Sequence, residues 1–150
     1  IKYKKVKKYM QNTFKLRIIT PKKVVYEKEV ASVTAPSASG EITILQKHVP
    51  LFSLLKEGVI KVKKENDETF FSIGGGYLET NGKETNILVS RAYHQDEIDE
   101  ELVKKAKESA EKLVKESKTK EERREAISSL RRTLIDMKVI KHRRHPKSSV

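Results

Sequence analysis

Four histidines are the residues best suited to acid–base or metal chemistry, but their spacing gives none of them a partner. His48, His94, His142 and His145 are scattered, and no cysteine or carboxylate stands at ligand spacing beside them. His142 and His145 are three residues apart, but they lie on a basic tail. Gly74-Gly75-Gly76 lacks the Lys-Ser/Thr of a phosphate loop, so we expect these glycines to permit a bulge or close backbone packing. The sequence thus predicts a binding or coupling protein, with no catalytic residues, no metal site and no cofactor.

Basic residues could also bind a partner, and the excess positive charge is concentrated at the two ends of the chain. The net charge is +12 over 150 residues. Residues 1–11 carry five lysines and no acid, whereas residues 123–150 carry nine basic and two acidic side chains. Such ends are either solvated segments or contacts for an acidic partner. The sequence alone leaves both alternatives open.

Strand signals fill the first two thirds of the chain. Residues 14–19 alternate apolar and basic side chains, as a half-buried strand does. Further short apolar runs follow up to residue 90, and turn residues such as Asn81-Gly82 separate them. This pattern predicts an all-β N-terminal domain, an antiparallel sandwich or barrel of about ten strands.

The period changes to helical after residue 93. We expect Asp96 to cap a first helix whose apolar face recurs in steps of three and four residues, at Ile98, Leu102, Ala106, Ala110, Leu113 and Ser117. Thr119-Lys120-Glu121-Glu122 is a capping box. It should open a second helix with Ile127, Leu130, Leu134 and Met137 on one face. The two helices are predicted to form an antiparallel hairpin with a thin apolar seam.

These signals divide the chain into four parts. They are a flexible basic arm (1–13), an antiparallel β-sandwich (14–92), a two-helix hairpin (93–142) and a basic tail (143–150). No apolar run approaches the ~20 residues that span a bilayer. The absence of cysteine suits a reducing compartment, so we expect an intracellular protein.

Residues 34–51 carry a resemblance to a known family. Thr34, Pro36, Gly40, Glu41, Leu45, His48, Pro50 and Leu51 match the pattern T-x-P-x-x-x-G-E-x-x-x-L-P-G-H-x-P-L. Gly75, Gly76, Leu78 and Glu79 match a later G-G-x-L-E run, and Asp96-Glu97-Ile98-Asp99 matches D-E-I-D. In this order and spacing, the chain resembles the epsilon subunits of bacterial and chloroplast F-type ATP synthases. One departure is that Gln46-Lys47 replaces the Pro-Gly before the histidine.

The resemblance implies a ten-stranded sandwich with a C-terminal hairpin, and a place at the foot of the rotating central stalk. Its implied partners are the gamma subunit, the membrane ring of c subunits and the alpha/beta hexamer. It implies that Glu41 contacts the c-ring and His48 contacts gamma, with Pro50 beside them. It also implies a peripheral position at the cytoplasmic face of a bacterial membrane, or alternatively at the stromal face of the thylakoid.

The hairpin of this family inhibits ATP hydrolysis when it extends toward an acidic loop of the beta subunit. Arg123, Arg124, Arg131 and Arg132 would make that contact here, since the planar guanidinium forks donate paired hydrogen bonds to carboxylates. Alternatively, these arginines pair with the acidic first helix. Some family members bind ATP through I/L-D-x-x-R-A, but residues 120–125 read KEERRE. Because these acids would repel a triphosphate, we expect no tight ATP binding.

Two alternatives come from other classes of protein. A basic nucleic-acid-binding module could use the arm and the tail, although the nine aromatic residues do not form a clustered platform. A scaffolding sandwich for an unknown partner is the other.

Overall fold

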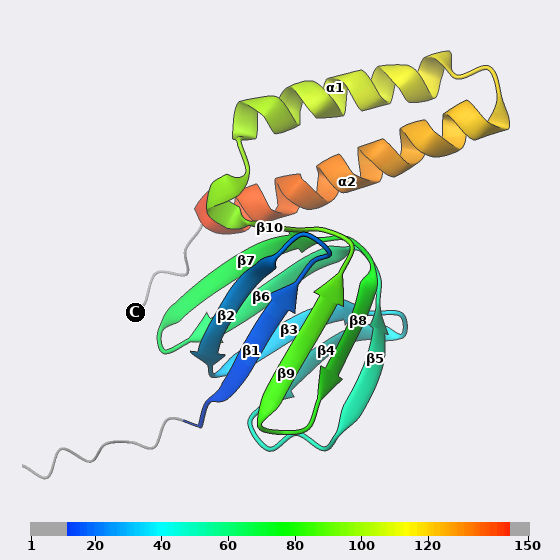
Figure 1. Ribbon diagram of the computed structural model, residues 1–150. Coiled ribbons are helices and arrows are strands. Elements are labelled where there is room, and N and C mark those ends of the chain that lie inside the picture. Colours follow the sequence, from blue (N-terminus) through cyan, green and yellow to red (C-terminus); the bar gives the residue numbers. More distant parts are fainter. Residues whose placement is uncertain (1–11, 145–150) are drawn as a thin grey trace, which may run out of the picture.

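The structure, a computed structural model, describes residues 12–144. Most of the predicted basic arm and residues 145–150 of the predicted tail, with His145, lie outside the described residues. Ten strands are followed by a short 3₁₀ turn and two helices (Figure 1). The elements are β1 Phe14–Ile19, β2 Val24–Val30, β3 Ser32–Ser37, β4 Gly40–Leu45, β5 Leu51–Leu55, β6 Gly58–Lys64, β7 Asp67–Ile73, β8 Gly76–Thr80, β9 Glu84–Val89, β10 Ala92–His94, η1 Gln95–Glu97, α1 Glu100–Glu116 and α2 Lys120–Arg144.

The strands form one sheet that folds over on itself into a sandwich. Its order is β10-β7-β6-β3-β5-β8-β9-β1-β2, with β4 paired to β3. The prediction of an all-β domain of about ten strands followed by a helical hairpin is confirmed. One pairing differs from the antiparallel expectation, because β1 lies parallel to β9. No local pattern signals that pair, since its partners are about seventy residues apart in the sequence.

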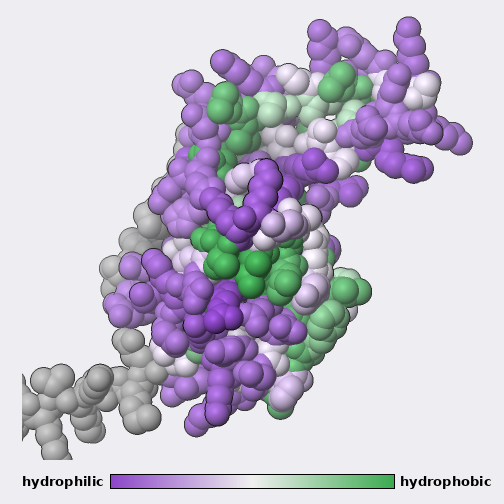
Figure 2. Space-filling model, viewed as in Figure 1, coloured by the Kyte–Doolittle hydropathy of each residue, from purple (hydrophilic) through white to green (hydrophobic). Residues whose placement is uncertain are grey.

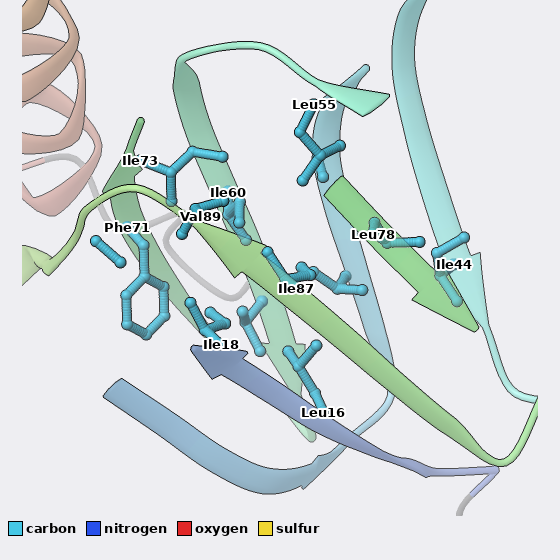
Figure 3. Packing of buried hydrophobic residues seen from close by; sticks show 14 of the residues in the cluster. Leu16, Ile18, Ile44, Leu55, Ile60, Phe71, Ile73, Leu78, Ile87 and Val89 are labelled. Atoms are coloured by element: carbon cyan, nitrogen blue, oxygen red, sulfur yellow. The ribbon is translucent and has the colours of Figure 1, made fainter. Parts of the chain in front are cut away.

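The alternating side chains of β1 show how the sandwich builds its core. Phe14, Leu16 and Ile18 point inward and are almost fully buried, while Lys15 and Arg17 point outward. Inward side chains of the other strands complete one cluster (Figure 3). Each fully buried side chain of this size contributes roughly 1.5–3 kcal/mol. The expected close packing at the glycines is confirmed, since a Cβ at Gly76 would lie 1.9 Å from the Leu88 carbonyl oxygen.

The first helix begins later than predicted. Asp99, not Asp96, caps α1, and its side chain accepts a hydrogen bond from the Leu102 N–H at 3.1 Å. Residues 95–97 form the separate turn η1, capped by His94. The predicted capping box is present at α2: the Glu122 N–H donates to Thr119 Oγ1, and the Glu122 carboxylate accepts from the Lys118 N–H. α2 runs to Arg144, two residues into the predicted tail.

The apolar faces predicted for the helices are partly wrong. Leu102 and Leu113 are 64% and 56% exposed, whereas α1 buries Val103 and Ala110. α2 lies between α1 and the sandwich (Figure 1), so it buries two faces instead of one. Ala126, Thr133 and Ile140 are buried at seven-residue spacing, and Ile135 and Val139 are buried on another side. The sequence pattern of α2 was interpreted as one apolar stripe, and one stripe cannot represent two buried faces.

Candidate protein-contact surfaces

An apolar row crosses the outer face of the sandwich. Val24 pairs with Ile19, Ile19 with Leu88, Leu88 with Tyr77, and Tyr77 with Leu54. Paired residues on neighbouring strands point to the same face, so these five side chains lie side by side across β2, β1, β9, β8 and β5. Figure 2 shows apolar side chains gathered on this part of the sandwich, below the hydrophilic hairpin. We call these five residues the apolar row.

The two ends of the apolar row, Val24 and Leu54, are exposed, and Ile19, Leu88 and Tyr77 between them are half-buried. Leu54 is 62% exposed, and the neighbouring Phe52 is 61% exposed and lies against Tyr77 with 5.1 Å between ring centroids. Exposed aromatic and aliphatic side chains on a strand scaffold form the kind of surface that a protein partner covers. This row was not predicted from the sequence, although Phe52 and Leu54, apolar residues at alternate positions of β5, are a signal for it.

Charged pairs occupy the part of the same face below the row. Glu27 accepts from Lys15 at 3.0 Å and lies 3.5 Å from Arg17. The hydrogen bond and the positive charge of Lys15, followed by the charge of Arg17, lower the pKa of the Glu27 carboxyl. The outer face of the sandwich therefore has an apolar part, the apolar row, and a polar part in which charged side chains form ion pairs.

The predicted contact residues Glu41 and His48 lie at opposite ends of β4. Glu41 is exposed beside the β3–β4 turn, whereas His48 lies three residues beyond Leu45, the last residue of the strand. The four residue steps from Glu41 to Leu45 alone span about 13 Å at about 3.3 Å per residue. The two residues therefore cannot form a single contact point. Pro50 is exposed and lies with His48 in the β4–β5 loop.

The β4–β5 loop keeps the backbone conformation of a glycine without having one. Lys47, in the place of the family's glycine, has a φ of 61°, in the left-handed region. The His48 N–H donates to the Leu45 carbonyl, and the Lys47 N–H donates to the Gly82 carbonyl at 3.0 Å. The Gln46-Lys47 departure thus leaves the turn closed against the β8–β9 turn. His48 Nδ1 lies 2.8 Å from the Val49 carbonyl oxygen.

The structure brings three of the four predicted arginines together on α2. Lys120, Arg123, Arg124, Ile127, Ser128 and Arg131 line one groove along the helix, and Arg132 lies outside it. All four arginines are exposed. Arg131 pairs with Glu57 of the sandwich at 3.5 Å instead of with the first helix. Several acids of α1 pair within α1 itself, as Lys107 with Glu111 and Lys112 with Glu116.

Comparison with known proteins identifies the class of this fold. Residues 13–95 match the family described as "ATP synthase, Delta/Epsilon chain, beta-sandwich domain". The ATP synthase epsilon chain of Dichelobacter nodosus is 37% identical over 107 residues, which cover 71% of this chain and 75% of that one. The epsilon chain of Trichodesmium erythraeum is 37% identical over 117 residues, covering 78% and 85%. That of Herpetosiphon aurantiacus is 34% identical over 130 residues, covering 87% and 96%.

Solved structures share the fold. A chain of the Euglena gracilis mitochondrial ATP synthase, from a structure of OSCP, F1 and the c-ring, superposes with a TM-score of 0.75 at 22% identity, covering 87% of this chain and 82% of that one. A chain of the Tetrahymena thermophila central stalk and c-ring gives a TM-score of 0.58 at 17% identity, covering 83% and 94%. The chain belongs to the epsilon-chain family of F-type ATP synthases. No helix in residues 12–144 is long and apolar enough to cross a membrane.

Proposed function

We propose that this chain is a non-catalytic subunit of the central stalk, which links the gamma subunit to the c-ring for proton-coupled ATP synthesis. The observation that carries the proposal is the apolar row, because a row of registered apolar side chains that are exposed or half-buried forms a surface for a partner to cover. The similar Tetrahymena chain comes from a structure of a central stalk and c-ring, and the Euglena chain from one that includes F1 and the c-ring.

The contacts divide between two partners. The apolar row faces gamma, and His48 and Pro50, which lie at the opposite end of β5 from Leu54, extend that contact along the sandwich. Glu41 faces the loops of the c-ring from the β3–β4 turn, where the Ala38 N–H donates to the Leu54 carbonyl at 3.1 Å, so the c-ring contact adjoins the Leu54 end of the apolar row. The complex thereby holds the subunit peripherally at the membrane surface, on the cytoplasmic side in a bacterium.

The hairpin restrains ATP hydrolysis through the arginines of α2. Arg123, Arg124, Arg131 and Arg132 are exposed and supply charge for an acidic loop of the beta subunit. Glu57 holds Arg131 in the docked hairpin, so Arg131 has to exchange partners when the hairpin extends. The bistable element is α2, docked on the sandwich or detached from it.

Binding to purified gamma tests the assignment of the apolar row. Leu54→Glu should weaken binding at least about tenfold, since it places a charge on the most exposed apolar side chain of the row. Asn66→Glu adds the same charge at the exposed β6–β7 turn and serves as the matched control. Both variants should keep the thermal midpoint of the unmodified protein. Equal affinity of the two variants for gamma would refute the proposed surface.

The regulatory role needs the assembled complex. Replacing the four arginines by alanine should raise ATP hydrolysis, whereas alanine at Lys104 and Lys105 on the exposed side of α1 should not. Unchanged hydrolysis in the arginine variant would count against the inhibitory contact.

A further inference from the structure

Gln95 joins three elements at the point where the chain leaves the sandwich. Its side-chain Oε1 accepts a hydrogen bond from the Phe70 N–H of β7 at 2.9 Å. Its backbone carbonyl accepts from Arg143 Nη1 of α2 at 2.7 Å. The same guanidinium nitrogen lies 3.1 Å from the Ile98 carbonyl. Arg143 therefore bridges both ends of the segment that connects the sandwich to α1.

This bridge is strong for physical reasons. A guanidinium is charged at every working pH, and its hydrogen bonds are charge-assisted. Its contacts with the two carbonyls are partly buried, where water competes less well for them. Phe70 is 7% exposed, so its N–H would have little other access to a hydrogen-bond acceptor if Gln95 moved away.

Apolar contacts close around the same point. The His142 ring stacks on Phe70 with 4.4 Å between centroids and an interplanar angle of 6°. Among the described residues, a second hydrophobic cluster consists of Phe70, Ile98, Val103, Val139 and Ile140. The last turns of α2, the connecting segment and β7 thus form one packed unit.

Nearer the tip of the hairpin, at the middle of α2, the contact with the sandwich is weaker. Arg131 and Glu57 are 3.5 Å apart, and the Arg131 side chain is 64% exposed. Exposed pairs of this kind contribute little to stability. The tip of the hairpin, between α1 and α2, projects beyond the sandwich (Figure 1). Docking is therefore concentrated at the C-terminal turns of α2.

We infer that Arg143 is the positioning residue of a hinge clamp. While its guanidinium holds the Gln95 and Ile98 carbonyls, the connecting segment stays folded against α2 and the hairpin cannot swing away. Release of Arg143 frees the segment and lets Gln95 leave Phe70. The clamp itself requires no partner; its consequence for ATP hydrolysis rests on the proposed function.

Amide hydrogen exchange at Phe70, measured by NMR on the full chain, tests the clamp. Arg143→Ala should accelerate exchange at Phe70 roughly tenfold or more, because closure of the segment loses two charge-assisted bonds. Arg143→Lys keeps the charge on a shorter side chain that reaches the two carbonyls less well, and should give an intermediate rate. Lys141→Ala removes the same charge from an exposed side chain in the same turns and should leave the rate unchanged.

Exchange in the sandwich core, at Leu16, checks that each variant folds. If Arg143→Ala does not fold, the exchange rate of the Phe70 amide in Arg143→Lys still has to exceed the rate in Lys141→Ala. Equal Phe70 rates in the Arg143 and Lys141 variants would overturn the clamp. Faster exchange without a change of hydrolysis in the assembled complex would support the clamp and contradict the proposed regulatory role.

Discussion

The contact between Ser72 and Asp136 gives the most direct measure of how firmly α2 is docked. The Ser72 hydroxyl of β7 is fully buried and donates to Asp136 Oδ1 of α2 at 2.5 Å. A hydroxyl that donates to a carboxylate forms a charge-assisted hydrogen bond. Ser72→Ala removes the donor and leaves a half-buried carboxylate without it.

The expected loss follows from these contacts. A hydrogen bond to a charged group contributes about 1.5–3 kcal/mol, so Ser72→Ala should raise the undocked fraction by a factor of about 10 to 150. Asp136→Ala should have a similar effect. In the double variant, the loss of docking free energy should be much smaller than the sum of the two single losses, because no carboxylate is left without its donor. We expect a coupling energy of about 1–2 kcal/mol.

Hydrogen exchange of the β7 amides beneath α2 provides the assay, with guanidinium unfolding of the sandwich as a check on the fold. Ser53→Ala on β5, which makes the same chemical change elsewhere on the sheet, is the matched control. Effects of the two single variants that add to within about 0.5 kcal/mol would refute this reasoning, because residues that share no interaction add in this way.

Two further perturbations test the sandwich itself. Gly76→Ala should destabilise the protein by about 1–3 kcal/mol or more, since its Cβ would meet the Leu88 backbone; Gly75→Ala, whose nearest neighbour is 3.6 Å away, should be close to neutral in thermal melting. Glu27 should contribute to the stability of the folded protein fully at a pH above the ordinary carboxyl pKa. This contribution should be lost as the pH falls through the lowered pKa of Glu27. A melting profile for Glu27→Gln that falls as steeply as that of the unmodified protein between about pH 5 and 3 would show that this pair contributes nothing.

The sequence determined the classes of element and their order. The alternation in residues 14–19 and the turn at Asn81-Gly82 depend on two- and four-residue geometry, which is local. The helical period after residue 93 is equally local. The family motifs correctly predicted the fold and the family to which the chain belongs. They also pointed to Glu41 and His48, but could not show that β4 holds the two residues apart.

Tertiary structure decided which surface each element buries. α2 packs on α1 and on β7 at once, so Ile135 and Val139 are buried while Leu134, predicted for the seam, is 42% exposed. The apolar row exists only because β1 lies parallel to β9, which brings Ile19 beside Leu88. Arg143, predicted to belong to a basic tail, lies against a segment 45 to 48 residues earlier. A periodic pattern specifies which residues share a face, but the partner of that face depends on contacts between distant segments, and these carry no local signal.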